Sequence, residues 1–298
     1  MLAALAALLV LAAPAPELEI ARALSAPPGG PRAVAATRPL LGAPYARSPL
    51  GEGSGRDPDP RFRLDAFDCM TLVETAIALG SATNLAEARL ALDAVRYASA
   101  PPSFAGRNHE VLSQWLPANV ARGFVADATS TLIGVEVRTA GKAYSAASWD
   151  AVRATGRAIP GLPRTRLPLG TFEAPVVAPG DVGRIAGQLP EGAVVFVVRA
   201  DAPERPTRIT HAGLVVQRPG GATLVRHATS SRGVERVIEE PIERFVRREE
   251  RAFPRWPLEG LSFWAIRDAS ERVRRLAARP APAPEAIEAS PAPPPRRL

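Results

Sequence analysis

Residues 192–227 read GAVVFVVRADAPERPTRITHAGLVVQRPGGATLVRH, and this stretch decides the fold class. The run Ala193–Val198 is continuously apolar and has the length of a strand, and its valines favour a buried strand over a helix. Residues 210–217 and 222–227 flank Arg218-Pro219-Gly220-Gly221, a sequence typical of a hairpin loop. Residues 261–267 have the pattern of a closing strand. This half of the chain therefore predicts an antiparallel sheet.

The region before these strands has helical patterns instead. Asp68 is a good N-cap, and Met70, Val73 and Ile77 follow it at helical spacing. A second helix is predicted after Asn84, and helical signals continue to about residue 123. Helices followed by antiparallel strands are typical of the α+β class, which we predict here.

The N-terminal end resembles a secretory signal. The apolar run 2–13 is followed by Pro14-Ala15-Pro16, and it is too short to span a bilayer, which needs about 20 residues. No Lys or Arg precedes the run, so the alternative is a hydrophobic tail from a misplaced start codon. We expect an exported protein of the periplasm or cell envelope, with no stable membrane insertion after the signal is removed.

Composition predicts where the folded part begins and ends. We predict a signal peptide at 1–16, a Pro/Gly-rich linker at 17–33 and a folded domain at 34–270 with a helical insertion at about 81–160. The Pro/Ala-rich tail 271–298 cannot bury a core and is predicted to be disordered.

The charge balance says little about partners. The 298-residue chain has a formal net charge of +7, and Lys142 is its only lysine, so arginine carries almost all of the positive charge. A basic surface attracts anionic partners such as cell-wall polymers, lipid headgroups or nucleic acid. No basic run is interleaved with aromatic residues, however, as single-strand binding requires. We expect a monomer that does not bind nucleic acid.

The stretch FDCMTLVE, residues 67–74, contains the only cysteine of the chain. A single cysteine excludes an intrachain disulfide and a multi-cysteine zinc site. Cys69 is expected in the first turn of a helix, where free N–H groups and the helix dipole favour a thiolate and can stabilise an oxyanion. A structural cysteine would more typically lie in the middle of a helix on its apolar side. The position therefore favours a nucleophile with a lowered pKa.

Two of the three histidines flank the predicted hairpin and supply a candidate base. His211 begins the strand HAGLVV, and His227 ends its partner. A loop of three or five residues centred on Pro219 places both histidines on one face of the sheet, directly opposite each other, whereas a loop of two or four separates them. On one face, His211 can act as the base and His227 can orient its ring. His109 lies in the helical region and is either structural or in contact with substrate.

These motifs occur in the order found in the NlpC-type papain-like cell-wall peptidases, a family that the chain resembles over about residues 34–268. The matching segments are Gly42-Ala43-Pro44-Tyr45, Phe67-Asp68-Cys69, residues 211–216 and His227-Ala228. The resemblance implies a half-barrel antiparallel sheet packed on the nucleophile helix. Most members have Ser-Gly after the cysteine, where this chain has Met70-Thr71. Together with Pro49-Leu50-Gly51-Glu52-Gly53 and Arg107-Asn108-His109, this difference resembles a particular branch of the family. Members of that branch have an added helical region between the cysteine and the sheet, and a characterised one is an N-acetylmuramoyl-L-alanine amidase.

The resemblance implies that Cys69, His211 and His227 are catalytic and that muropeptides are the substrate. We assign Tyr45, Asp68 and His109 to substrate binding, although Tyr45 could instead be a surface anchor. The alternatives are a γ-D-glutamyl-diamino acid endopeptidase, a thioester-forming acyltransferase, and a wall-binding module without activity. No cofactor and no metal are expected, because the chain lacks a compact ligand cluster such as His-Glu-x-x-His.

Overall fold

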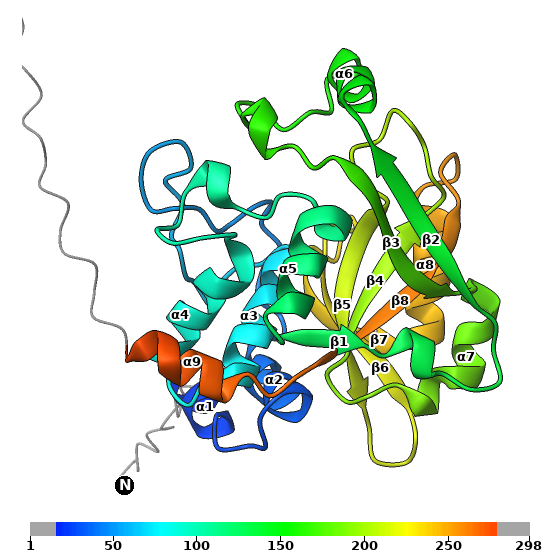
Figure 1. Ribbon diagram of the computed structural model, residues 1–298. Coiled ribbons are helices and arrows are strands. Elements are labelled where there is room, and N and C mark those ends of the chain that lie inside the picture. The colour runs from blue at the N-terminus through cyan, green and yellow to red at the C-terminus, as the bar shows by residue number, and fades with distance from the viewer. Residues whose placement is uncertain (1–15, 279–298) are drawn as a thin grey trace, which may run out of the picture.

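A computed structural model describes residues 16–278 of the chain. It contains an eight-stranded sheet in which all neighbouring strands are antiparallel, in the order β2-β3-β8-β4-β5-β6-β7, with β1 also paired to β8 (Figure 1). The strands are β1 (Val125–Asp127), β2 (Val137–Tyr144), β3 (Gly170–Val177), β4 (Val194–Arg199), β5 (Ile209–Gln217), β6 (Thr223–Thr229), β7 (Arg236–Pro241) and β8 (Leu258–Ile266). The predicted α+β class is confirmed.

Helices lie on both sides of the sheet, with most of the N-terminal ones together at one side (Figure 1). Those within the described residues are α1 (Pro16–Ala23), α2 (Gly30–Thr37), α3 (Cys69–Ser81), α4 (Leu85–Arg96), α5 (Leu116–Ala121), α6 (Ala146–Ala154), α7 (Val182–Ile185), α8 (Ile242–Ala252) and α9 (Ser270–Ala277). None of these helices has both the length and the apolar character that crossing a membrane requires.

The central strands are buried because helices pack on both of their faces. Every residue of α3 from Thr71 to Ser81 is buried, and its Val73 and Ile77 share a core with Leu214 of β5. On the opposite face, Val215 of β5 packs in a second core with Phe245 of α8. Helices α3 and α8 are therefore held against opposite faces of the same central strands.

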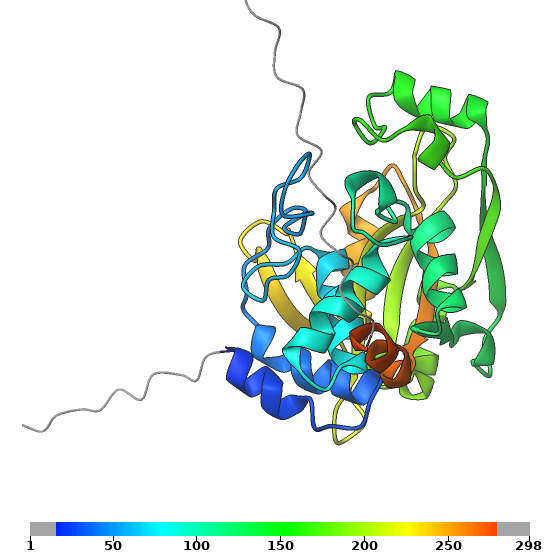
Figure 2. The same cartoon turned by 60° about the vertical axis from the view of Figure 1, so that its left-hand side comes forward.

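The predicted strands in residues 192–267 correspond to β4, β5, β6 and β8, and the predicted helix at Cys69 is α3. The expected helical insertion at 81–160 is only partly helical, because it also contains β1 and β2. Strand β2 pairs with β3, and the two form an arm that carries α6 at its end (Figure 2). Five of the eight residues of β2 are exposed or only partly buried, so its sequence lacks the apolar run that marks β4.

The predicted linker at 17–33 is wrong, since this stretch contains α1 and the start of α2. Ile20 is fully buried, and the backbone of Gly30 lies so close to Glu191 that a side chain at this position would clash. The prolines and glycines here start a helix and allow close packing, two roles that composition alone does not separate from a linker.

The folded domain also extends beyond its predicted end at residue 270. Helix α9 packs against α4 and buries Val273, so the first residues of the predicted tail belong to the domain. The remaining tail, 279–298, and nearly all of the predicted signal peptide, 1–15, lie outside the described residues.

Candidate active site

A capping box fixes the start of α3. The carboxylate of Asp68 accepts a hydrogen bond from the Thr71 N–H at 2.7 Å, and the Thr71 hydroxyl accepts one from the Asp68 N–H at 2.9 Å. The second carboxylate oxygen of Asp68 accepts the Ser48 N–H at 3.1 Å. Cys69 is consequently the first residue of the helix. The N–H of Met70, in the same turn, is directed at the Cys69 sulfur.

A cavity of about 760 Å³ opens beside Cys69. It lies where β5 begins and β6 ends, and α8 and the loop at Tyr45 complete its wall. Its lining residues are Tyr45, Cys69, Thr210, His211, Ala228, Thr229, Ser230, Ser231, Arg244, Arg247, Arg248, Glu249, Arg251, Ala252 and Phe253. Cys69 remains partly exposed, so a ligand in the cavity can reach it.

The two strand histidines form the next layer of the site. Gln217 pairs with Thr223, so the loop comprises five residues, 218–222, and is centred on Gly220 and not on Pro219 as expected. Both histidines lie on one face of the sheet, as predicted, but the predicted directly opposed pairing is wrong. They are diagonal neighbours rather than directly opposite, and His211 Nε2 lies 2.7 Å from His227 Nδ1. The second ring nitrogen of His211, Nδ1, has no hydrogen-bond partner among the described residues, and His211 lines the cavity together with Cys69.

Two backbone features allow this contact. Strand β5 has a bulge beside His211, because Val197 of β4 pairs with His211 while Val198 pairs with Ile209. Bulges of this kind re-aim a side chain and are frequent beside active sites. In addition, a Cβ on Gly213 would lie 2.9 Å from the Arg226 carbonyl and 3.1 Å from the His227 Cβ. Only glycine lets the two strands bring the rings together here.

The chain of polar contacts continues into β7 and α8. The buried Glu240 accepts a hydrogen bond from His227 Nε2 at 3.2 Å, and Arg248 pairs with its other carboxylate oxygen at 2.6 Å. Phe245 of α8 packs against both imidazoles, with ring centroids 5.7 Å from His211 and 5.0 Å from His227. The site is therefore a row of polar side chains on the adjacent strands β5, β6 and β7, and α8 packs against this row through Phe245 and Arg248.

One family of known proteins matches most of the folded domain. Residues 35–252 match the family model described as AmiA-like, N-acetylmuramoyl-L-alanine amidase-like, and this range contains Cys69 and both strand histidines. The chain belongs to the AmiA-like family. A search of curated proteins finds no match.

Solved structures give the same fold at low identity. A Legionella pneumophila protein of the DUF1460 family is 20% identical, with a TM-score of 0.65, over 85% of this chain and 89% of that one. An N-acetylmuramoyl-L-alanine amidase from Bacteroides uniformis is 16% identical, with a TM-score of 0.59, over 85% of this chain and 99% of that one. A Bacteroides fragilis protein provisionally called a xylanase is 17% identical, with a TM-score of 0.56, over 76% and 96%. At these identities the likeness concerns the fold alone.

In this AmiA-like chain, the thiol does not have the lowered pKa expected for a helix start. Burial raises the pKa of Cys69 to about 12, and the charge of Asp68 acts in the same direction. The N–H groups of Ala212 and Met70 lower the pKa but do not compensate. The expectation was wrong because it weighed the helix end and not the removal of water from the sulfur. The resting group is a thiol.

The histidines are neutral at rest as well. Burial lowers the pKa of His211 well below its ordinary value, and the charges of His227, Arg248 and Arg199 lower it further. Burial also lowers the pKa of His227, although Glu240 opposes this shift. A thiol beside a neutral imidazole needs the imidazole as a base during attack, whereas a preformed thiolate–imidazolium pair would not.

This neutral pair predicts a pH dependence. His211 must be unprotonated to act as a base, and its pKa is lowered, so the acidic limb of kcat/KM should lie below pH 6.5. Alkylation of free Cys69 by iodoacetamide should rise roughly tenfold per pH unit between pH 6 and 9, because only the thiolate reacts. A plateau in the alkylation rate across neutral pH would instead indicate a preformed ion pair.

The three predicted substrate-binding residues fall in different places. Tyr45 lines the cavity, and burial, with the nearby Cys69 and Asp68, raises its pKa, so it carries a hydroxyl that can donate. Asp68 does not line the cavity, and both of its carboxylate oxygens are used within the protein. His109 is not brought to the site either: its Nε2 lies 2.6 Å from the Phe104 carbonyl oxygen.

Sequence reasoning missed Glu240, Arg248 and the other arginines of α8. Glu240 pairs with Val225, two residues from His227 on β6, so it shares the face of the histidines. Residues 236–241 show no regular alternation of polar and apolar side chains, so no local signal in the sequence indicates that Glu240 lies on this face. Among the described residues, no group of three or more His, Cys, Asp or Glu side chains is arranged to hold a metal ion.

Proposed function

We propose that this AmiA-like protein is a cysteine-dependent amidase that cleaves the amide between N-acetylmuramic acid and L-alanine in muropeptides. The observation that carries the proposal is one cavity holding Cys69, at the start of α3, together with His211, whose ring is hydrogen-bonded to His227. The family match and the amidase from Bacteroides uniformis support the choice of bond. We extend the proposal to a papain-like arrangement of nucleophile helix and sheet.

In the proposed mechanism, His211 Nδ1 takes the proton of the Cys69 thiol as the sulfur attacks the lactyl carbonyl carbon. The backbone N–H of Cys69 and the hydroxyl of Tyr45 are the donors to the oxyanion of the tetrahedral intermediate, because the N–H groups of Met70 and Thr71 are already bonded to the Cys69 sulfur and the Asp68 carboxylate. The imidazolium of His211 then protonates the L-alanine nitrogen, the C–N bond breaks, and the peptide leaves. Water, deprotonated by His211, then hydrolyses the thioester, which releases N-acetylmuramic acid with a free lactyl carboxyl group, and His211 returns the proton to the sulfur to restore the thiol.

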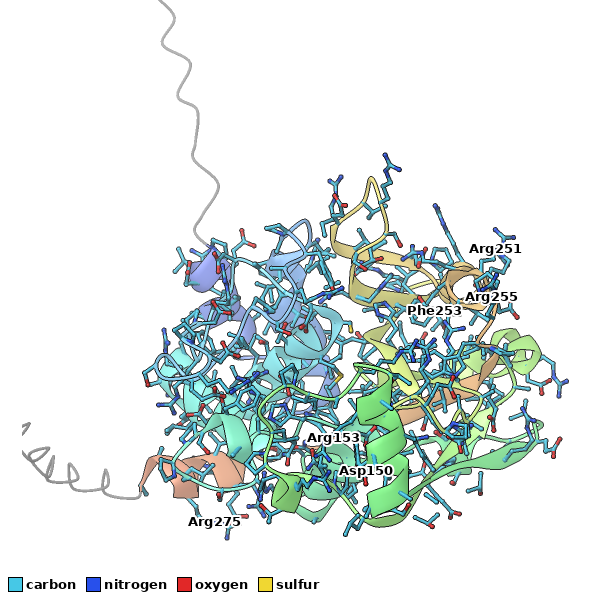
Figure 3. The ribbon with its side chains drawn as sticks, turned by 90° about the horizontal axis from the view of Figure 1, so that it is seen from above. Asp150, Arg153, Arg251, Phe253, Arg255 and Arg275 are labelled. Carbon is cyan, nitrogen blue, oxygen red and sulfur yellow. The ribbon has the colours of Figure 1, made fainter. Side chains whose placement is uncertain are left out.

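The arginines of α8 suit the acidic peptide part of such a substrate. Arg247 and Arg251 line the cavity, and neither takes part in the ion pairs found among residues 16–278. Muropeptide stems carry several free carboxylates, and guanidinium groups bind carboxylates with two parallel hydrogen bonds. Arg251 lies near Phe253 and Arg255 at one edge of the molecule (Figure 3). We therefore place the stem peptide along α8.

Charge reversal on α8 tests this placement. The double variant Arg247→Glu/Arg251→Glu should raise KM for a tripeptide muropeptide about 10-fold, since both arginines are exposed and each lost ion pair of this kind costs up to about 1 kcal/mol. The change in kcat should be smaller. Arg255→Glu is the matched control, because Arg255 is exposed nearby and does not line the cavity. An equal rise in KM for the control would show a general field effect and no stem-peptide site.

The product spectrum tests the bond. Incubation with a purified muropeptide should release N-acetylmuramic acid and an intact peptide beginning with L-alanine, as identified by mass spectrometry. Cleavage of the stem peptide after D-glutamate would contradict the amidase proposal and support the endopeptidase alternative. Transfer of the acyl group to an added amine, in place of hydrolysis, would indicate the acyltransferase.

We also propose export to the periplasm or cell envelope, where this substrate occurs. The proposal rests on the apolar run 2–13 and the small residues after it. Fractionation of cells that express the full chain, followed by N-terminal sequencing, should find a processed form outside the cytoplasm. An unprocessed cytoplasmic protein would contradict it.

A further inference from the structure

One ring nitrogen of His227 faces two groups that cannot both bond to it. His227 Nε2 lies 3.2 Å from the Glu240 carboxylate oxygen Oε1 and 3.2 Å from Nη1 of Arg248. A carboxylate only accepts hydrogen bonds and a guanidinium only donates them. The bond to Glu240 requires a proton on Nε2, and the bond to Arg248 requires a lone pair there. Each choice selects a different tautomer of the neutral ring.

The tautomer of His227 determines that of His211, because the two rings share one hydrogen bond. With the proton of His227 on Nε2, its Nδ1 accepts from His211 Nε2–H, which leaves a lone pair on His211 Nδ1. With the proton on Nδ1, His227 donates to His211 Nε2, and the proton of His211 then resides on Nδ1. Only the first arrangement presents a base to Cys69.

We propose that Glu240 and Arg248 select the tautomer of the two-histidine chain: Glu240 holds His211 in its basic form, and Arg248 favours the form that cannot deprotonate Cys69. Glu240 is thus a positioning residue that acts through two rings. The proposal rests on the assignment of Cys69 and His211 as nucleophile and base, and it does not depend on which amide is cleaved.

The packing around Glu240 explains why its contact prevails. Burial acts to raise the pKa of Glu240, but the hydrogen bond with His227 and the charge of Arg248 outweigh burial and keep its pKa below the ordinary value. The carboxylate stays charged and is only 3% exposed, and Arg248 Nη2 is its ion-pair partner, 2.6 Å from Oε2 but without hydrogen-bond geometry, so His227 supplies the side-chain hydrogen bond that the carboxylate accepts. Arg244 is farther from the carboxylate, at 3.4 Å. Phe245 packs against both rings and opposes a rotation that would exchange their nitrogens.

The test uses a variant that preserves shape. Glu240→Gln keeps the side-chain volume but offers an amide N–H to His227 Nε2, in the same direction as Arg248. We expect kcat to fall by about 100-fold or more, as for other catalytic histidines held in the wrong tautomer, with little change in KM. Adding Arg248→Met should restore kcat at least in part. Without the guanidinium, the side-chain amide introduced by Glu240→Gln can rotate so that its oxygen accepts a hydrogen bond from His227 Nε2, as the carboxylate did. Adding Arg244→Met is the matched control and should not restore it.

A direct readout comes from long-range ¹H–¹⁵N spectra of the histidine rings. The wild-type protein should show protonated Nε2 on both His211 and His227, and Glu240→Gln should show protonated Nδ1 on both. His109, which lies outside the cavity, serves as an internal reference and should not change. These spectra need no substrate, so they remain informative if the proposed amidase activity is absent.

Three results would overturn the proposal. The first is a Glu240→Gln variant with unchanged ring protonation. The second is a loss of kcat that Arg248→Met and Arg244→Met restore equally, which would indicate a general charge effect. The third is a loss of kcat that follows a fall in the melting temperature and that neither substitution restores, which would indicate a structural role.

Discussion

Cys69→Ala is expected to abolish turnover of muropeptides, with a loss of kcat/KM of at least about 10⁴-fold, because the thioester pathway has no other nucleophile. Cys69→Ser should be almost as inactive, since a hydroxyl is a far weaker nucleophile than a thiol beside the same base. Both variants should melt within a few degrees of the wild type, because neither substitution changes the capping box at Asp68 and Thr71. The comparison requires a continuous assay of peptide release.

Chemical modification provides an independent check. Because Cys69 is the only cysteine, its alkylation and the loss of activity should proceed at the same rate. A correctly folded Cys69→Ala protein that retained activity, or an enzyme that survived complete alkylation, would contradict the thiol mechanism. Treatment with a chelator should leave activity unchanged. The reverse pattern would point to a metalloamidase.

His211→Ala should cost as much activity as the loss of Cys69, because base and nucleophile act as one unit. His227→Ala should be less damaging, with a loss of about 10²-fold, since it removes only the group that orients the base. His227→Gln or His227→Asn should recover part of that loss, because an amide can still hydrogen-bond the ring of His211. The double variant His211→Ala/His227→Ala should be no worse than His211→Ala alone.

His109→Ala is the internal control for this series. The structure uses His109 to bond the Phe104 carbonyl, outside the cavity, so its replacement should leave kcat near the wild-type value. If His227→Ala were as inactive as His211→Ala, His227 would have a direct catalytic role. If His109→Ala lost activity without losing stability, the assignment of the base would need revision.

Local patterns explain what could be predicted from the sequence. The apolar run at 193–198 and the hairpin loop at 218–222 specify β4, β5 and β6 by short-range signals, and Asp68 marks the start of α3 by its capping chemistry. The face shared by His211 and His227 follows from the length of one loop. These features needed no knowledge of how distant segments pack.

The remaining features depend on packing between distant segments. The pairing of β6 with β7 brings Glu240 to His227, and α8 brings Arg248 to both, so neither residue has a local signature. The raised pKa of Cys69 follows from burial that its helix position does not reveal. The glycines at 29 and 30 resembled a linker because composition does not distinguish flexibility from close contact.

The most direct test is the mass of the acyl group trapped on Cys69. The enzyme is mixed with a muropeptide, quenched in acid within the first turnover and digested, and the peptide containing Cys69 is analysed by mass spectrometry. Our account predicts an N-acetylmuramoyl thioester on this cysteine and none in the His211→Ala variant. A peptidyl group ending in D-glutamate on Cys69, or product formation with no adduct on the sulfur at any time, would contradict it.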